Sequence, residues 1–513
     1  MTLLLKIGNA IFNMLMVFWL YFAVYFMFQY LTFNYNDLKS IDAKLLILTS
    51  LLLVLIFYFR EKTKQIIAFI YKNIINHKAI VFLVLVIFQL VITVTSLGLA
   101  AADTTVVYNI ATNPQFALET DYISIYPNNF LLVIWMKLNH TIFGANDLVA
   151  LALWNIAFID VAIVIMYQII KQTMGIFIAN INFVLSAFLL GLSPQYIYTY
   201  SDPITIVLLT SLIWAIVQVV YQPNKPVYAI SAGVLLAITY GFRPTVMIFM
   251  IAGVIVLLTR TTIAKQYFKK IGILLALALC SFMLVNRAIA FALNHQEFVK
   301  YEPGVSRTLA YYVNLGLTYQ GNIHAEIPQE VAQARGAERN QTALADISKR
   351  LDNYTFESFT GHLYYKYYWM IGEGMFGWLQ ERVLSEETRP NIAWLKKIQD
   401  SSFATWVRSY VYVGGDNYYL YGMAMQVVWI IASVGLVFFY RSYSVHNWYQ
   451  LWMQIALFGA LMFLLIFEAG RSRYLLQFIP AVLSVSSIGL YSLASSRKKD
   501  ESISVTGKEN SDE

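Results

Sequence analysis

The chain has 513 residues, of which 59% are hydrophobic and only 13% carry a charge. Soluble proteins of this size have about a quarter of their residues charged, so this composition excludes a soluble globular protein. The net charge of +7 does not indicate nucleic-acid binding, because the basic residues fall in short segments between apolar runs, where they orient membrane spans. The sequence therefore predicts an all-α polytopic membrane protein with no nucleic-acid partner.

Apolar runs long enough to cross a bilayer recur along the chain. We predict about twelve transmembrane helices, at residues 7–31, 44–59, 79–101, 149–170, 176–195, 204–221, 227–241, 244–259, 272–293, 424–440, 450–467 and 474–493. No small-residue cleavage pattern follows the run 7–31, so we expect a retained helix rather than a signal peptide. The single cysteine, Cys280, excludes a disulfide framework and a cysteine-based metal site.

The basic residues predict how the chain is oriented in the membrane. Segments 60–78 and 260–271 and the tail from Arg497 are rich in lysine and arginine, whereas 102–130 and 196–203 contain none. Lysine and arginine favour the cytoplasmic side, so the first group should face the cytoplasm and the second the outside. With an even number of spans, both termini are predicted to be cytoplasmic, in a multi-pass protein of the plasma membrane.

Two long segments interrupt the hairpins and define the predicted domains. Residues 1–293 form an N-terminal transmembrane module whose outer loop, 102–148, contains a semi-apolar stretch expected to lie at the membrane interface. Residues 294–423 are much less hydrophobic and are predicted to form a small, mainly helical extracellular domain. Residues 424–495 are the C-terminal transmembrane helices, and 496–513 are expected to be a disordered cytoplasmic tail.

One helix of the predicted extracellular domain has a clear start signal. Thr355 is a plausible N-cap, because threonine accepts hydrogen bonds from the first backbone amides of a helix. Apolar residues then recur at helical spacing, at Phe356, Phe359, Leu363 and Met370. We expect an amphipathic helix that buries this face.

The first candidate site residues lie in the outer loop. Asp103 follows the apolar run at once, and a carboxylate so close to hydrocarbon is costly unless it is functional or paired. The alternative is that Asp103 caps the following helix. Further on, "DYISIYPNNFL" places Asp121, Tyr126 and Asn128 in a polar turn, which is also the pattern of a simple turn before a helix.

Two later outer segments add an acid and a base. Asp202 in "SPQYIYTYSDPI" stands before a proline at the outer end of a helical hairpin, where helix capping would equally explain it. Arg243 in "YGFRPTVMIF" stands directly before a helix. An arginine beside a helix N-terminus is typical of a phosphate site, although an arginine that extends its charged end to the interface is the simpler interpretation.

A last outer segment, "FEAGRSRYLLQFIP", carries Glu468, Arg471, Arg473 and Tyr474. An internal ion pair would explain the acid beside the two arginines. Taken together, however, the acids and three arginines come from separate segments that all map to the outer membrane edge. An anionic headgroup at that depth would meet the arginines, and an acceptor arriving from outside would meet Asp103.

The order of these motifs resembles that of the GT-C membrane glycosyltransferases, in the branch of protein O-mannosyltransferases and aminoarabinose transferases, and especially its Gram-positive members. The resemblance covers residues of roughly 80–485. The matching motifs are Asp103 in a "DxxxVYxxA"-like helix, Tyr126-Pro127-Asn128, Tyr200-Ser201-Asp202, Arg243-Pro244-Thr245 and Glu468…Arg473-Tyr474-Leu475…Pro480. Two departures stand out, since Thr104 replaces a second acid and Arg243 stands where relatives often have lysine.

The resemblance implies transfer of a sugar from a polyprenyl-phosphate-linked donor to an extracytoplasmic acceptor, namely a cell-wall glycopolymer, a glycolipid or a protein. Asp103 would act as general base, and inversion at the anomeric carbon is expected. The cations Arg243, Arg471 and Arg473 would bind the donor phosphate. Contacts to sugar or acceptor would come from Asp121, Tyr126, Asn128, Asp202, Glu468 and Tyr474. No cofactor or divalent metal is expected, since the six histidines are scattered.

Other functions remain open at this stage. A transporter or lipid-linked-sugar flippase would place ionisable residues near the membrane midplane, often in repeated halves. A structural or assembly protein would make the acid–arginine pattern accidental. An oligosaccharide ligase of the same superfamily is a related enzymatic alternative. The sequence identifies neither the sugar nor the acceptor, nor the oligomeric state.

Overall fold

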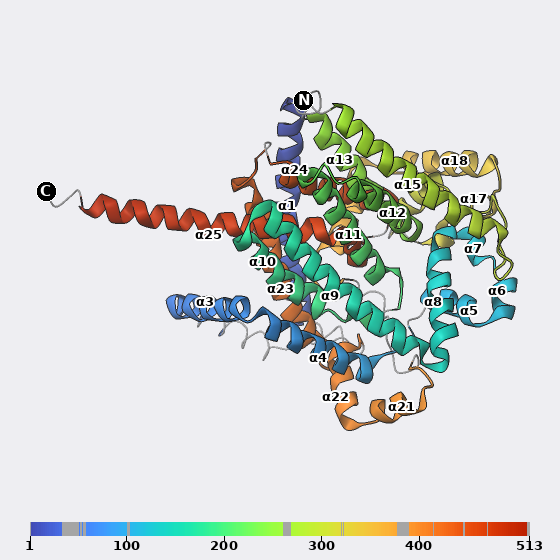
Figure 1. Ribbon diagram of the computed structural model, residues 1–513, viewed down its shortest axis with the longest axis horizontal. Coiled ribbons are helices and arrows are strands. Elements are labelled where there is room, and N and C mark those ends of the chain that lie inside the picture. The colour runs from blue at the N-terminus through green and yellow to red at the C-terminus, as the bar shows by residue number, and fades with distance from the viewer. Residues whose placement is uncertain are drawn as a thin grey trace.

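The structure is a computed structural model that describes residues 2–32, 51, 54, 58–99, 103–197, 199–259, 268–319, 321, 323–376, 389–413, 415–444, 447–468 and 470–509. These residues form helices and no strand (Figure 1). The first half contains α1 (Thr2–Thr32), α3 (Arg60–Asn76), α4 (Lys78–Ser96), α5 (Asp103–Thr112), α6 (Pro114–Glu119), α7 (Tyr122–Ile125), η1 (Pro127–Asn129), α8 (Phe130–Phe143), η2 (Gly144–Asn146), α9 (Asp147–Met174), α10 (Ile176–Ser186), η3 (Ala187–Gly191), η4 (Pro194–Ile197), α11 (Ser201–Tyr221), α12 (Val227–Phe242), η5 (Pro244–Val246) and α13 (Met247–Thr259).

The second half contains α15 (Phe268–His295), α16 (Leu309–Gly316), η6 (His324–Glu326), α17 (Gln329–Gln333), α18 (Glu338–Asp352), α19 (Phe356–Ile371), α21 (Ala393–Gln399), α22 (Ser402–Val411), α23 (Tyr418–Phe438), η8 (Phe439–Arg441), α24 (Trp448–Phe467), η9 (Ser472–Phe478) and α25 (Ile479–Glu509). The η elements are short 3-10 turns, except η3, which is a turn of π-helix. The predicted all-α class is confirmed.

The predicted spans coincide with apolar helices. In the described residues, eight helical stretches are long and apolar enough to cross a membrane, at Leu5–Tyr30, Lys78–Ser96, Pro127–Met174, Ser201–Tyr221, Lys269–His295, Tyr418–Arg441, Trp448–Phe467 and Ser472–Ser495. Three shorter apolar helices, Ile176–Gly191, Val227–Phe242 and Pro244–Thr259, fall on the remaining runs. The predicted span 44–59 lies largely outside the described residues.

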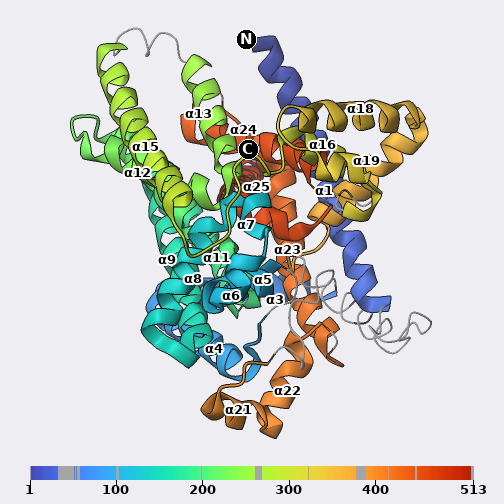
Figure 2. The ribbon, with the colours of Figure 1, turned by 90° about the vertical axis from the view of Figure 1, so that its right-hand side faces the viewer.

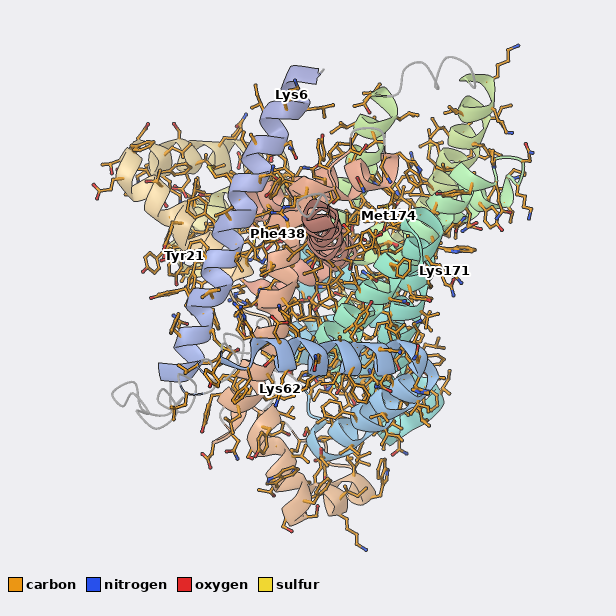
Figure 3. The ribbon with its side chains drawn as sticks, turned by 90° about the vertical axis from the view of Figure 1, so that its left-hand side faces the viewer. Lys6, Tyr21, Lys62, Lys171, Met174 and Phe438 are labelled. Atoms are coloured by element: carbon orange, nitrogen blue, oxygen red, sulfur yellow. The ribbon has the colours of Figure 1, made fainter. Side chains whose placement is uncertain are left out.

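The segments predicted to face opposite sides of the membrane lie at opposite ends of the molecule. In Figure 1, α3 and the end of α25 extend on the left, whereas α5, α6, α7 and α8 lie on the right. Figure 3 looks at the left-hand end, where Lys62 of α3 and Lys171 near the end of α9 are labelled. Segment 60–78 is not an open loop, since α3 occupies most of it. The helix bundle is held by close packing of α1 on α23, α23 on α25, and α9 on both α10 and α11.

The segment 294–423 divides into two groups of helices. The first group packs α18 on α16 around a small core of Tyr311, Leu315, Ile327, Val331 and Ala343. The second group, α21 and α22, packs instead on α4. Figure 2 shows these two groups at opposite edges of one face, with α5, α6 and α7 between them.

Helix α19 begins as predicted, and its second half buries the predicted face. Thr355 and Ser358 form a capping box at its start. Phe356, at the start, is 86% exposed, whereas Met370, near the end, is buried. Lys366 lies on the same face as Leu363 and Met370. Its ammonium group reaches two backbone carbonyl groups of neighbouring elements, which allows a lysine to be buried on an apolar face.

The C-terminal tail also differs from the prediction. Helix α25 continues beyond its apolar part to Glu509, so residues 496–509 are helical where a disordered tail was expected. No proline or glycine occurs between Ser496 and Thr506. Extending an existing helix needs no new nucleation, so the polar residues can follow the apolar ones without a break.

Candidate active site

The centre of the candidate site is a buried carboxylate between two arginines. Asp202 lies in the first turn of α11, and its Oδ1 is 3.4 Å from the Nη2 atom of Arg243. Its Oδ2 is 3.6 Å from the Nε atom of Arg473. Arg243 ends α12, and Arg473 lies in η9. Three segments that are far apart in the sequence thus meet at one charged cluster, as the sequence predicted.

The aromatic ring of Tyr200 contacts both arginines of this cluster. Its ring centroid lies 5.2 Å from the guanidinium carbon of Arg243 and 5.3 Å from that of Arg473. Arginine cations are attracted to the faces of aromatic rings. The Tyr200 ring therefore stabilises both guanidinium groups in addition to Asp202. Burial alone would lower the pKa of Arg243, but Asp202 and Tyr200 raise it above its usual value, and the guanidinium stays charged.

A chain of hydrogen bonds leads from this cluster to Asp103. The amide of Asn129 donates to the hydroxyl of Tyr122 at 2.9 Å and to that of Tyr200 at 3.4 Å. Tyr122 in turn donates to Asp103, the first residue of α5. Burial raises the pKa of Tyr122, and the nearby Tyr200 and Asp103 raise it further, so this hydroxyl remains a donor. Asp103 itself is exposed and accessible to a molecule arriving from solvent.

Glu468 and Lys366 border the cluster on its other side. Burial raises the pKa of Glu468, against the opposing effects of Arg243, Arg473, Lys366 and Arg471. Burial lowers the pKa of Lys366 to about 8, although Glu468 opposes this shift. The Lys366 ammonium donates to the carbonyl oxygen of Gly316 at 2.9 Å and to that of Leu465 at 2.7 Å. Lys366 therefore attaches the outer helix α19 to the segment that carries Glu468.

The turn after Glu468 approaches α19 so closely that only glycine fits. A Cβ atom added to Gly470 would lie 2.7 Å from the Cα atom and the carbonyl oxygen of Lys366. These are backbone atoms, which cannot move aside as a flexible side chain would. The glycine of "FEAGRSRY" thus lets the backbone pass Lys366 and brings Arg471 and Arg473 to the cluster.

The cluster carries an excess of positive charge. Arg243, Arg471, Arg473 and Lys366 all act electrostatically on Glu468, and Asp202 is the other carboxylate in contact with them. Tyr474 contributes its ring to Arg473, at 5.8 Å from the guanidinium carbon. Lys366 and the three arginines thus concentrate positive charge beside Asp202 and Glu468, which makes the cluster suited to bind an anion.

Three further predicted site residues make contacts other than those to Asp202 and its two arginines. Asp121 forms an exposed ion pair with Lys300 at 2.8 Å. Tyr126 accepts a hydrogen bond from Arg307, whose guanidinium carbon stands 4.7 Å from the tyrosine ring centroid. Asn128 is half-buried in η1, but the neighbouring Asn129 makes the contacts to Tyr122 and Tyr200. Of the "YPNN" motif, the second asparagine therefore belongs to the site.

His324 was missed because no motif in the sequence distinguishes it from the other five histidines. Its Nδ1 is 3.1 Å from the Tyr311 hydroxyl, and its Nε2 is 3.4 Å from Arg307. Burial and the charge of Arg307 lower the pKa of His324 to about 4, opposed by Asp103. The imidazole is therefore neutral near pH 7 and lies within electrostatic reach of Asp103.

A cavity of 470 Å³ opens beside α5. Thr105 and Tyr108 of α5 line one wall, and Arg389 and Asn391 line another. The Tyr108 hydroxyl donates to the buried Asp147 at 2.9 Å. Thr105 lies two residues after Asp103, and residues at this spacing point to different sides of a helix, so the cavity lies on another side of α5 than Asp103.

Comparison with known protein families assigns the chain to one of them. A family model described as "Conserved hypothetical integral membrane protein" matches residues 2–493. The chain belongs to this family. As in any such integral membrane protein, its apolar helices are membrane spans, so the predicted membrane localisation is confirmed.

Other comparisons add little to this assignment. No curated protein matches the sequence of this integral membrane protein. Among solved structures, the apo form of ArnT from Cupriavidus metallidurans is similar with a TM-score of 0.32 and 11% sequence identity, over 81% of this chain and 78% of that chain. A TM-score of this size carries no argument about function, so the function is argued from the residues of the site.

Proposed function

We propose that the protein is a membrane glycosyltransferase that moves a sugar from a polyprenyl-phosphate donor to an extracytoplasmic acceptor. The convergence of Asp202, Arg243 and Arg473 carries this proposal. Both arginines contact the ring of Tyr200, whose hydroxyl is connected through Asn129 and Tyr122 to Asp103. The order of the sequence motifs, which resembles that of GT-C glycosyltransferases, supports it. The proposal includes a plasma-membrane enzyme with cytoplasmic termini, acting in cell-wall or surface glycosylation without a cofactor.

The arginines would bind the donor phosphate. The lipid tail would lie between the helices, with its phosphate at headgroup level against Arg243, Arg471 and Arg473. When the bond from the anomeric carbon to the phosphate oxygen breaks, negative charge accumulates on the leaving phosphate. Fixed cations at that position stabilise the transition state more than the ground state, which is what accelerates the reaction.

Asp103 would act as the general base. The acceptor hydroxyl oxygen forms a bond to the anomeric carbon, its proton passes to Asp103, and the polyprenyl phosphate leaves with the electron pair of the broken bond. Attack opposite the leaving group inverts the anomeric centre. The hydrogen bond from Tyr122 would orient the carboxylate, and the acceptor would approach from the solvent, to which Asp103 is exposed.

The contacts of Asp202 change its proposed role. Asp202 is almost completely buried between its two arginines. We propose instead that Asp202 positions Arg243 and Arg473 and keeps two like charges at the distance that a phosphate requires. Glu468 and Tyr474 remain candidates for contacts with the sugar.

The test follows the products of one turnover. Membranes that contain the protein are incubated with radiolabelled polyprenyl-phosphate sugars, and free polyprenyl phosphate is separated from the donor. The proposal predicts release that stops with Asp103→Asn and continues with Asp121→Asn, because Asp121 pairs with Lys300 away from the arginines. Release that is unaffected by Asp103→Asn would contradict the proposal.

A transporter or flippase is the second candidate, and one observation favours it. Asp160 is buried in the middle of α9, so ionisable groups are not confined to the outer edge as the sequence analysis assumed. Proton-linked and ion-linked transporters place acids at this depth. The same labelled lipids distinguish the two functions, since transport moves the intact donor across the membrane without breaking its phosphate bond.

A further inference from the structure

Asp160 is a buried carboxylate deep within the membrane bundle. It lies 13 residues from the start of the 28-residue helix α9, which places it about 20 Å along the axis from either end. Only 6% of its surface is exposed. Its Oδ1 accepts a hydrogen bond of 3.0 Å from the side-chain amide of Gln89 on α4.

The C-terminal end of a short helix contacts the same Gln89 side chain. Helix α10 runs into the π-helical turn η3, which ends at Gly191. The carbonyl oxygen of Gly191 accepts a hydrogen bond of 3.2 Å from the same Gln89 amide nitrogen. Carbonyl groups at a helix C-terminus carry partial negative charge and favour cations, and π-helical turns occur frequently at functional sites.

Several buried oxygen atoms in this region have no hydrogen-bond partner among the described residues. They are Gln89 Oε1, Thr93 Oγ1, Ser193 Oγ and Tyr196 Oη. All four residues are almost completely buried. Thr93 lies one helical turn after Gln89, Ser193 and Tyr196 follow the end of η3, and Tyr196 is within electrostatic reach of Asp160. Helices α4 and α9 both pack on η3 and η4, so the four residues belong to elements that are in contact with one another.

The charge of Asp160 has no cationic partner in the described part of the chain, where Gln89 is the side chain that contacts it. An ionised carboxylate in hydrocarbon surroundings is costly unless a cation or proton neutralises it. Uncharged oxygen ligands around one carboxylate suit a hard, monovalent cation, because divalent calcium and magnesium sites use more carboxylates or more water. Discontinuous helices that end within the membrane provide such carbonyl ligands for sodium in transport proteins.

We propose that Asp160, Gln89 and the Gly191 carbonyl group bind a sodium ion within the membrane bundle. Rotation of the Gln89 amide by half a turn exchanges its nitrogen and oxygen, which ordinary structural data do not distinguish. The amide oxygen then faces Asp160 Oδ1 and the Gly191 oxygen, so three oxygens from α4, α9 and η3 converge. Thr93, Ser193 and Tyr196 supply further oxygens. This site is separate from the arginine cluster and does not depend on the glycosyltransferase proposal.

The test measures the thermal stability of the purified full-length chain in sodium, potassium and choline chloride at constant ionic strength. Unfolding is followed by the fluorescence of the 11 tryptophans. A ligand that binds only the folded state raises its stability as the ligand saturates the site, so sodium should raise the Tm saturably, by about 5 °C at high occupancy. Potassium and choline should not.

Variants locate the effect. Asp160→Asn should abolish the sodium dependence while leaving a folded protein, because it removes the charge that requires neutralising. Asp400→Asn is the matched control, since Asp400 is exposed and pairs with Arg389, and this variant should keep the full sodium response. Equal Tm values of the unmodified protein in all three salts, or a sodium response retained by Asp160→Asn, would overturn the proposal.

A chemical probe separates sodium from a proton. Apolar carbodiimides react with protonated carboxyl groups in membranes, and sodium bound at Asp160 should protect that residue from modification. Protection by sodium and not by potassium is the expected result, read by mass spectrometry of the modified peptide. Modification that depends on pH alone, with no sodium protection, would assign Asp160 to a neutral carboxylic acid and overturn the sodium site.

Discussion

Two buried aspartates of this protein are stabilised in opposite ways. Asp202, at the outer end of α11, stands between Arg243 and Arg473. Asp160, in the middle of α9, has the neutral amide of Gln89. Both are almost fully buried. The difference shows that burial alone does not define the function of a carboxylate, because its partners decide whether it can organise other groups or bind a cation itself.

The comparison also separates an anion site from a cation site. Around Asp202, cations are in excess, so the outer cluster is suited to bind a phosphate. Around Asp160, oxygens are in excess, so the inner cluster is suited to bind a cation. Replacing Asp202 should therefore destabilise the outer cluster. Replacing Asp160 should instead remove a charge that no other described residue of the inner cluster neutralises.

The largest expected effect is on turnover. Asp103→Asn should lower the release of polyprenyl phosphate by about 10²- to 10⁴-fold, the usual contribution of a general base. The variant should stay folded, because Asp103 is exposed. Initial rates measured with Asp121→Asn as the matched control should change less than about twofold, since an exposed ion pair contributes little. Equal losses in the two variants would remove Asp103 from the proposed mechanism.

The next effect concerns stability and tests the comparison directly. Asp202→Asn leaves two buried arginines without their acid, and breaking a buried ion pair in this way costs about 3–5 kcal/mol. Asp160→Asn, measured without sodium, should not lower the free energy of unfolding. Thermal unfolding of both variants in choline chloride gives the answer. The same loss in both would mean that the two acids are not stabilised differently.

A smaller effect is expected when only the geometry of a cation changes. Arg243→Lys keeps the charge but loses the planar group that binds an anion with two parallel hydrogen bonds. Binding of radiolabelled polyprenyl phosphate should weaken by about tenfold, with binding of the neutral polyprenol unchanged. Arg441→Lys, in the turn η8 that follows α23, serves as the control and should bind as the unmodified protein does.

The smallest effect concerns the pH dependence of the outer helices. The pKa of His324 is lowered to about 4, so its contribution to stability is complete above its usual pKa near 6.5 and is lost as pH falls through about 4. Hydrogen exchange in residues 309–326 should therefore accelerate between pH 6.5 and 4. In the His324→Gln variant, the hydrogen-exchange rate of these residues should depend less on pH, after correction for the intrinsic exchange rate. An unchanged pH dependence would exclude His324 as its cause.

Much of the fold could be predicted from composition and hydropathy. The apolar runs identified the helices of the bundle, and the basic helix α3 lies at the opposite end of the molecule from α5, α6 and α7 (Figure 1). The burial of a lysine, Lys366, on the apolar face of α19 could not be predicted, because its two carbonyl partners belong to α16 and α24. No periodicity within α19 reveals partners contributed by other helices.

The site was predictable as far as its motifs were distinctive. Asp202, Arg243 and Arg473 stand in short polar interruptions of apolar sequence, and they do converge. Tyr122 and Asn129 were in the motifs but looked like ordinary turn residues, and only the packing of η1 on Tyr200 selects them. Asp160 was overlooked because a single acid barely changes the hydropathy of a long apolar run.

A structure of the protein in lipid nanodiscs with polyprenyl phosphate added would test the central claim most directly. We expect phosphate density in contact with Arg243 and Arg473, on the side of the bundle where Asp103 is exposed to the aqueous phase. Phosphate bound away from these arginines, or an Asp103 side chain directed to the opposite membrane face, would contradict it.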